Sequence, residues 1–194
     1  MKQLVFLFLL FSVVAISAGA QTEDAAAHPF RLRADLGFCH WYADELRSSV
    51  DLTHLTAGLG FRPGFEFLEI RLRYELAQVE TVTGGTAAAF DGDYIHFFSG
   101  GLAACQTFDL GFQELTVFAG LNAFVPLLDD AVSLGASLGL GVEYRFRPKP
   151  DSDLSFGIFL EVHNQYYELN LPDGSKTDLQ CDVSVDLGVV VTLW

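Results

Sequence analysis

After its first twenty residues, the sequence lacks any long, continuous apolar run. Apolar residues make up 51% of the 194-residue chain. Beyond residue 20, however, they are dispersed, and no segment approaches the roughly 20 continuous apolar residues that a membrane-spanning helix needs. This absence excludes a helical membrane protein and leaves two classes: an exported soluble β protein or a membrane barrel.

Basic residues are scarce as well. Eleven Lys and Arg stand against 25 Asp and Glu, which gives a formal net charge of -14. Such an acidic chain is a poor match for nucleic acid, so we expect no nucleic-acid partner. The excess acid either keeps loops solvated or contacts lipopolysaccharide through divalent cations.

Cysteine is rare, with only Cys39, Cys105 and Cys181 in the chain. Their wide spacing forms no CxxC or Cys/His ligand pattern, so we expect no metal site and no cofactor. Cys39 and Cys181 are the pair to test for a disulfide, because the first and last strands of a closed barrel are neighbours. The alternation of the sequence places these two on opposite faces, which argues against the bridge.

The N-terminus has the pattern of a secretory signal. Lys2 supplies the positive charge, residues 4–16 are apolar, and Ala18-Gly19-Ala20 offers small residues for cleavage. We therefore predict a cleaved signal peptide at residues 1–20, a periplasmic N-terminal segment at 21–28 and a single barrel domain at 29–194.

From Phe30 onward the chain contains eight stretches in which large apolar residues occupy every second position, the pattern of strands with one apolar face. The third is the cleanest: apolar residues alternate there with Glu69, Arg71, Arg73 and Glu75. The fourth is irregular, because Ile95, Phe97 and Phe98 break the alternation and predict a bulge or register change. The predicted strands are 30–42, 53–62, 68–76, 94–107, 115–125, 132–146, 156–167 and 179–193.

The direction of the apolar face follows from volume. The interior of an eight-stranded barrel is just wide enough to be filled by side chains, and about forty apolar residues would overfill it. The other face, rich in Gly, Ser and Thr, suits a narrow interior. We therefore predict an all-β, eight-stranded antiparallel up-and-down transmembrane β-barrel in a bacterial outer membrane. A soluble barrel or sandwich is the alternative.

This orientation places charged side chains in the lumen, where they must be paired and hydrogen-bonded. They form either a structural plug or a narrow ion path. Four inward aromatic residues form a candidate apolar pocket: Phe118, Phe124, Phe159 and Tyr167. The predicted lumen charge network consists of Arg31, Arg33, Asp35, Glu69, Arg71, Arg73, Glu75, Glu143, Arg145, Glu161, Asp182 and Asp186.

Aromatic residues near the strand ends predict interfacial girdles. The outer girdle would contain Trp41, Tyr42, Tyr94 and Tyr166. The periplasmic girdle would contain Phe61, Phe65, Tyr144, Phe146 and Trp194.

On this pattern, the signal peptide and the terminal aromatic, residues 29–194 resemble the small eight-stranded outer-membrane family of OmpA transmembrane domains, OmpX and OmpW. The resemblance implies insertion by the barrel-assembly machinery, which recognises a final strand ending in an aromatic. Trp194 would be that signal, although it is out of phase with Leu193 and Val191.

Three functions are compatible with these observations. The first is a non-enzymatic barrel with a charged, largely plugged lumen, which serves envelope structure or surface interaction through loops that contact lipopolysaccharide or other surface ligands. The second is an OmpW-like passage for small hydrophobic molecules. The third is a lipid A-modifying enzyme, but His163-Asn164-Gln165 lacks the Ser that such enzymes place two residues after the His. We therefore expect that the protein is not an enzyme.

Overall fold

The computed structural model describes residues 30–43, 48–63, 67–84, 94–111, 113–126, 132–146, 154–170 and 176–193. Within the strands, the side chains of residues 43, 48, 132, 133, 169, 170, 176–183 and 193 lie outside this description. The strands are β1 (Phe30–Ala43), β2 (Ser48–Phe61), β3 (Leu68–Thr83), β4 (Tyr94–Asp109), β5 (Gln113–Pro126), β6 (Val132–Phe146), β7 (Leu154–Asn170) and β8 (Lys176–Leu193).

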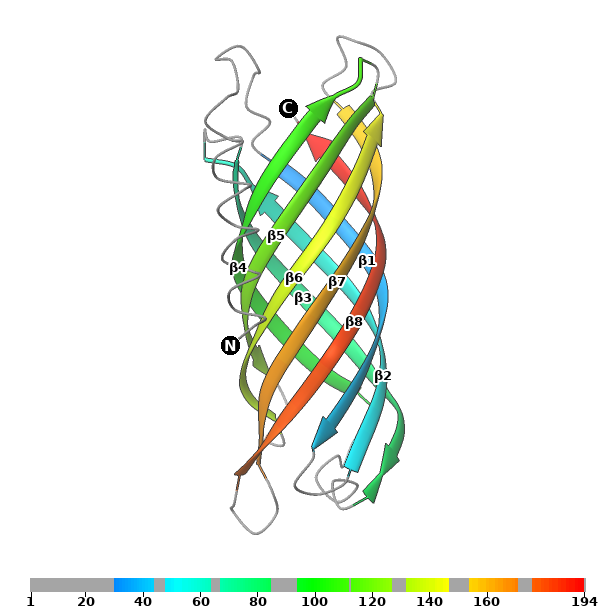
Figure 1. Cartoon of the computed structure of the whole chain (residues 1–194), viewed down its shortest axis with the longest axis vertical. Coiled ribbons are helices and arrows are strands. Elements are labelled where there is room, and N and C mark those ends of the chain that lie inside the picture. Colours follow the sequence, from blue (N-terminus) through cyan, green and yellow to red (C-terminus); the bar gives the residue numbers. More distant parts are fainter. Residues whose placement is uncertain are drawn as a thin grey trace.

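Each strand pairs antiparallel with its neighbour in the chain, and β1 pairs with β8 to close a barrel (Figure 1). The predicted eight-stranded up-and-down architecture is thereby confirmed. Phe30 lies opposite Leu193 at one end of the barrel, which we call the entry end. At the opposite end, the loop end, Tyr42 lies opposite Ser49. In the described part of the chain, no helix has the length and apolarity to cross a membrane.

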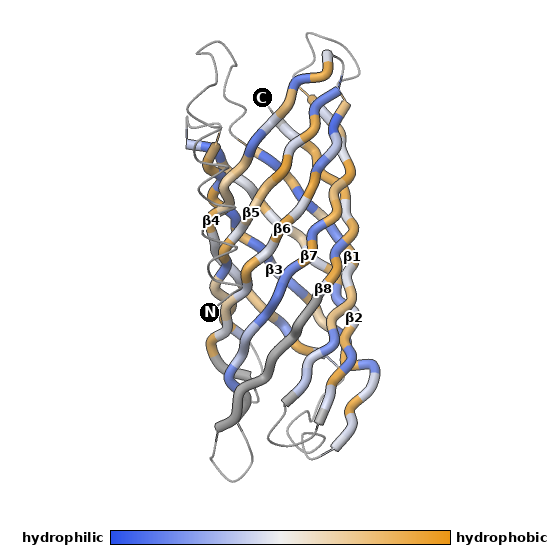
Figure 2. The backbone as a smooth tube through the Cα atoms, in the orientation of Figure 1, coloured by the Kyte–Doolittle hydropathy of each residue, from blue (hydrophilic) through white to orange (hydrophobic). Residues whose placement is uncertain are grey.

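Apolar side chains point outward from the barrel and polar ones inward. Leu36 and Leu187 are 64% and 63% exposed, whereas Glu69 and Glu143 are fully buried. Figure 2 shows the resulting alternation of hydrophobic and hydrophilic residues along the strands. This arrangement inverts that of a soluble protein, in which Arg and Glu are almost never fully buried and large apolar residues fill the interior.

The fourth strand is regular, so the predicted bulge there is wrong. β4 pairs with β3 and β5 without a register shift. Ile95 and Phe97 are fully buried inside the barrel, while Phe98 is exposed outside. The alternation looked broken because two inward positions of this strand are apolar instead of polar.

The last strand, by contrast, contains a register shift that the sequence pattern did not indicate. Cys39 lies opposite Ser184, but two residues later Trp41 lies opposite Cys181, so β8 contains one extra residue. The alternation predicted for 179–193 is therefore not continuous. The expectation that Cys39 and Cys181 lie on opposite faces depended on that continuity and no longer holds. Cys39 is disulfide-bonded, and the side chain of Cys181 lies outside the described part of the structure.

Candidate functional site

The lumen contains a network of buried ion pairs, and three glutamates are its centres. The first is Glu69 on β3. Its carboxylate lies 3.0 Å from Arg31, 2.9 Å from Arg71 and 3.5 Å from Arg62. Because these arginines come from β1, β3 and the residue after β2, this one carboxylate ties three neighbouring segments together near the entry end.

Glu143 on β6 is the second centre. It lies 3.2 Å from Arg31, 2.5 Å from Arg33 and 2.8 Å from Arg145. β1 and β6 are not neighbours in the barrel, so the pairs with Arg31 and Arg33 cross the lumen.

Glu161 on β7 is the third centre. It accepts a hydrogen bond from Arg73 and lies 3.5 Å from Arg71 and 3.9 Å from Arg33. Because Arg33 contacts both Glu161 and Glu143, and Arg71 contacts both Glu161 and Glu69, the three centres form one connected network. Every member is nearly excluded from solvent.

Two aromatic side chains cover the guanidinium groups of this network. Arg71 lies over Phe118, with its Cζ 4.1 Å from the ring centroid, and Arg33 lies 4.5 Å from the centroid of Phe159. The face of an aromatic ring attracts a cation, and it does so more strongly when both groups are shielded from water. Phe118 and Phe159 therefore pack against the arginines of the polar network, and Phe118 also packs with Ala103 and Cys105.

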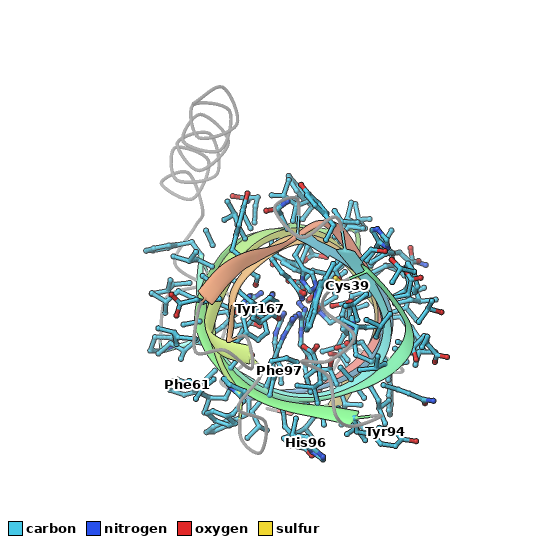
Figure 3. The ribbon with its side chains drawn as sticks, turned by 90° about the horizontal axis from the view of Figure 1, so that it is seen from below. Cys39, Phe61, Tyr94, His96, Phe97 and Tyr167 are labelled. Carbon is cyan, nitrogen blue, oxygen red and sulfur yellow. The ribbon has the colours of Figure 1, made fainter. Side chains whose placement is uncertain are left out.

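Toward the loop end the interior becomes apolar. Phe97, Phe124, Tyr167 and Trp41 pack together, and Trp41 and Tyr167 have ring centroids 4.8 Å apart. In Figure 3, which views the barrel from the loop end, Phe97, Tyr167 and Cys39 lie inside the ring of strands, whereas Phe61, Tyr94 and His96 lie outside it. We call this group the aromatic cluster; its other buried members are Cys39, Val50, Leu52, Ala77 and Ile95.

The aromatic cluster differs from the pocket expected from the sequence. Phe124 and Tyr167 belong to it, but Phe118 and Phe159 cover arginines. Trp41 was expected in the outer girdle, yet it is only 1% exposed and lies inside. Trp41 is paired opposite Val50 on β2, which begins five residues earlier than the sequence pattern predicted.

The other predicted girdle residues lie in several places. Tyr94 and Tyr166 are exposed on the outside, as are Phe61, Tyr144 and Phe146, and Tyr42 is half-buried. Phe65 and Trp194 lie outside the described residues.

Between the ion-pair network and the aromatic cluster lies a group of histidines and carboxylates. His54 Nε2 lies 2.8 Å from Asp186 Oδ1, and His163 Nε2 lies 3.5 Å from Asp186 Oδ2. Gln165 connects this group to the aromatic cluster, because its amide nitrogen lies 3.1 Å from His163 Nε2 and its oxygen accepts a hydrogen bond from Trp41 Nε1.

The structure places the predicted charged residues in two groups. Eight lie in the ion-pair network: Arg31, Arg33, Glu69, Arg71, Arg73, Glu143, Arg145 and Glu161. Asp35, Glu75 and Asp186 are buried nearer the histidines, and the side chain of Asp182 lies outside the described residues.

Sequence reasoning omitted two residues from the network. Arg62 contacts Glu69, and Glu114 contacts Arg145 at 2.7 Å. The signal for both was present in the alternation: Arg62 is two residues after inward Gly60, and Glu114 is two residues before inward Thr116. Arg62 is the last residue of the strand predicted at 53–62, and Glu114 immediately precedes the strand predicted at 115–125, so both lie at the edges of the predicted strands.

His163, the histidine considered above for a lipid A-modifying motif, faces the lumen. His163 is 4% exposed, and its neighbours are Asp186 and Gln165. An enzyme acting on a membrane lipid needs its nucleophile and base open to that lipid. The described geometry around His163 does not provide this access.

No protein-family model matches the chain, and no curated protein matches it. Among solved structures, the chain is similar to Neisserial surface protein A (NspA), with 16% identity, 87% of this chain and 99% of that chain covered, and a TM-score of 0.49. It is also similar to the outer membrane protein OprG from Pseudomonas aeruginosa, with 13% identity, coverage of 89% and 99%, and a TM-score of 0.47. Both similarities concern the fold alone.

Proposed function

We propose that this chain is an integral barrel of the bacterial outer membrane. The support is its outer surface, where large apolar side chains such as Leu36, Leu134 and Leu187 are each more than 60% exposed. A continuous apolar exterior of this kind requires a lipid environment, because soluble monomers rarely expose apolar patches larger than a few hundred Å².

We further propose that the lumen is closed and that the barrel is not an enzyme. The observation that carries this proposal is that Glu69, Glu143 and Glu161 each contact at least three arginines across the interior. Such a network is costly to break, because removing one partner leaves an uncompensated buried charge. The protein would then contribute to envelope structure or act through its extracellular loops, most of which lie outside the described residues.

The location and the closed lumen can be tested separately. For location, we expect the protein in the outer-membrane fraction, with a band in unboiled detergent gels that shifts on heating. Recovery of folded protein from periplasmic extract without detergent would contradict the membrane location. For the lumen, purified barrel in planar bilayers is expected to show no steady conductance. Reproducible single-channel steps would contradict closure and leave the membrane location intact.

A passage for small hydrophobic molecules is the second candidate, and the aromatic cluster at the loop end is the observation that favours it. Its rings are closely packed, with neighbouring centroids 4.8 to 6.4 Å apart, so a ligand would have to displace them. Faster entry of a hydrophobic fluorescent probe into vesicles that contain the barrel would support this candidate, and an unchanged rate would exclude it.

The proposed partners are outer-membrane lipids, lipopolysaccharide at the acidic loops and the barrel-assembly machinery. The support for them is the apolar exterior and the acidic composition.

A further inference from the structure

Two histidines and an aspartate converge in the lumen. His54 on β2, His163 on β7 and Asp186 on β8 each offer a donor atom, and these atoms all lie within 4.8 Å of one another. The three residues are 2%, 4% and 1% exposed. Donor atoms in a tetrahedral zinc site with bonds of about 2.0 Å lie about 3.3 Å apart. His54 Nε2 lies 2.8 Å from Asp186 Oδ1 and His163 Nε2 lies 3.5 Å from Asp186 Oδ2, so each histidine is near that distance from one of the two carboxylate oxygens.

The strand register produces this convergence at a glycine. Gly37 on β1 lies opposite His54 on one side and opposite Asp186 on the other. A Cβ at Gly37 would clash with both His54 Nε2 and Asp186 Oδ1. The two side chains therefore lie directly against the backbone of Gly37, a close approach that only glycine permits because it has no Cβ.

The charges around the group are unbalanced. In the described part of the chain, the ion pairs of Glu75 and Asp186 are with histidines only, and Asp35 has none within 4.0 Å. Arg73 attracts Asp35 and Asp186 through its charge, but its hydrogen bond goes to Glu161. Asp35, Glu75 and Asp186 therefore share Arg73 and the two histidines as their sources of positive charge. Buried carboxylates are costly unless they are fully paired, and a divalent cation would add positive charge to the group.

The surroundings of the His54 imidazole also suit metal binding. Glu75 Oε1 lies 4.0 Å from His54 Nδ1, the ring nitrogen that does not face Asp186. At this distance Glu75 acts on the ring through its charge; a carboxylate that closes to hydrogen-bond distance of this nitrogen orients a metal-binding histidine and raises its basicity. On the other imidazole, His163 Nδ1 has no hydrogen-bond partner among the described residues, while Nε2 faces Asp186 and the Gln165 amide.

We propose that His54 Nε2, His163 Nε2 and a carboxylate oxygen of Asp186 bind a divalent transition-metal ion, with Glu75 positioning the His54 ring. Two imidazoles with one carboxylate suit Zn²⁺, Ni²⁺, Co²⁺ or Cu²⁺, whereas Mg²⁺ and Ca²⁺ prefer oxygen ligands throughout. The bound ion would link β2, β7 and β8. This site goes beyond the proposed function and does not depend on it, because a closed barrel without metal would still be a closed barrel.

The test uses Co²⁺ as a spectroscopic probe. The full barrel is refolded in detergent micelles with EDTA or with Co²⁺, so that the ion is present while the lumen forms. We expect one Co²⁺ per barrel, visible absorption bands of a site with nitrogen ligands, and a higher unfolding midpoint with Co²⁺. His54→Gln and His163→Gln should each abolish the bands, and Glu75→Gln should weaken affinity about 10- to 100-fold.

The matched control removes the other histidines. The triple variant His28→Gln/His40→Gln/His96→Gln keeps only His54 and His163, and it should bind Co²⁺ as the unaltered chain does. Loss of the bands in this variant, or their survival in both lumen variants, would overturn the proposal. So would the absence of bands in unaltered barrel refolded with Co²⁺.

A heat-dependent shift of the band on gels shows whether the lumen variants fold. In case they do not, a second measurement uses the unaltered chain and needs no variant. X-ray absorption of the Zn²⁺-loaded chain should show two imidazole ligands and at least one oxygen ligand. A spectrum with oxygen ligands alone would overturn the site. Neither measurement depends on conductance or cellular location, so a failure here is distinguishable from a failure of the proposed function.

Discussion

Arg33 Nη2 donates a hydrogen bond to Glu143 Oε2 at 2.5 Å, although the two residues are 110 positions apart in the chain. Arg33 lies on β1 and Glu143 on β6, which are not adjacent strands. The bond therefore exists only when the barrel is closed. The same carboxylate group also lies 3.2 Å from Arg31 and 2.8 Å from Arg145, so three buried arginines share this one counter-charge.

Replacing Glu143 with Gln should destabilise the barrel by about 3 kcal/mol or more, because three buried arginines lose a shared counter-charge. Urea unfolding in detergent micelles or lipid vesicles measures the change. Glu80→Gln is the matched control. Glu80 is exposed and accepts a hydrogen bond from Thr53 at 2.8 Å, so its loss should cost less than about 1 kcal/mol. Equal effects of the two substitutions would contradict a tightly coupled network.

Gly37→Ala should destabilise the barrel by about 1 to 3 kcal/mol, because the added methyl group overpacks the lumen against His54 and Asp186. Gly100→Ala provides the comparison, since a Cβ there would lie 3.6 Å from Leu72 in ordinary van der Waals contact. Measuring the free energies of unfolding of the two variants tests this expected difference. If Gly100→Ala proves the more damaging, the lumen around Gly37 is not packed as described.

Leu187→Arg tests whether the outer surface faces lipid. Leu187 is 63% exposed and lies opposite Leu36 and Leu160, all well within their strands. An arginine near the bilayer midplane costs about 2 to 4 kcal/mol, but only about 0 to 1 kcal/mol near the interface. Folding into vesicles should therefore be impaired by Leu187→Arg far more than by Phe108→Arg, which alters the end of β4. A soluble barrel would tolerate both substitutions.

Two substitutions in the aromatic cluster should affect stability differently, because one removes a hydroxyl group and the other removes a whole ring. Tyr167 Oη is buried without a hydrogen-bond partner among the described residues. Tyr167→Phe should therefore leave stability unchanged or raise it slightly, since an unsatisfied polar atom is removed. Phe97→Ala should instead cost about 3 to 5 kcal/mol through the cavity it creates. Unfolding midpoints measure both effects, and a large loss from Tyr167→Phe would indicate a partner for the hydroxyl.

Much of the fold was predictable because strand periodicity is local. Glu69, Arg71, Arg73 and Glu75 alternate with apolar residues over a few positions, which placed them on one face, and the small volume of an eight-stranded barrel identified that face as the inner one. Where the local pattern was ambiguous, the prediction was wrong: β4 has apolar residues at the inward positions Ile95 and Phe97, which resemble a disrupted strand.

Less of the candidate site was predictable, because the contacts that build it connect distant strands. The sequence placed Phe118 and Phe159 on the inner face, but only the packed structure shows that they cover Arg71 and Arg33. The register shift in β8 is also a property of strand pairing, and no residue near Cys181 indicates it in the sequence.

By itself, the amino-acid sequence determined the strand class, the number of strands and, outside the fourth and eighth strands, which side chains share a face, since the alternation that reveals them is a local pattern. Only the tertiary structure decided which arginine meets which glutamate and that His54, His163 and Asp186 converge above Gly37. The physical reason is that barrel closure and strand register, neither of which is encoded in any short segment, set every distance across the lumen.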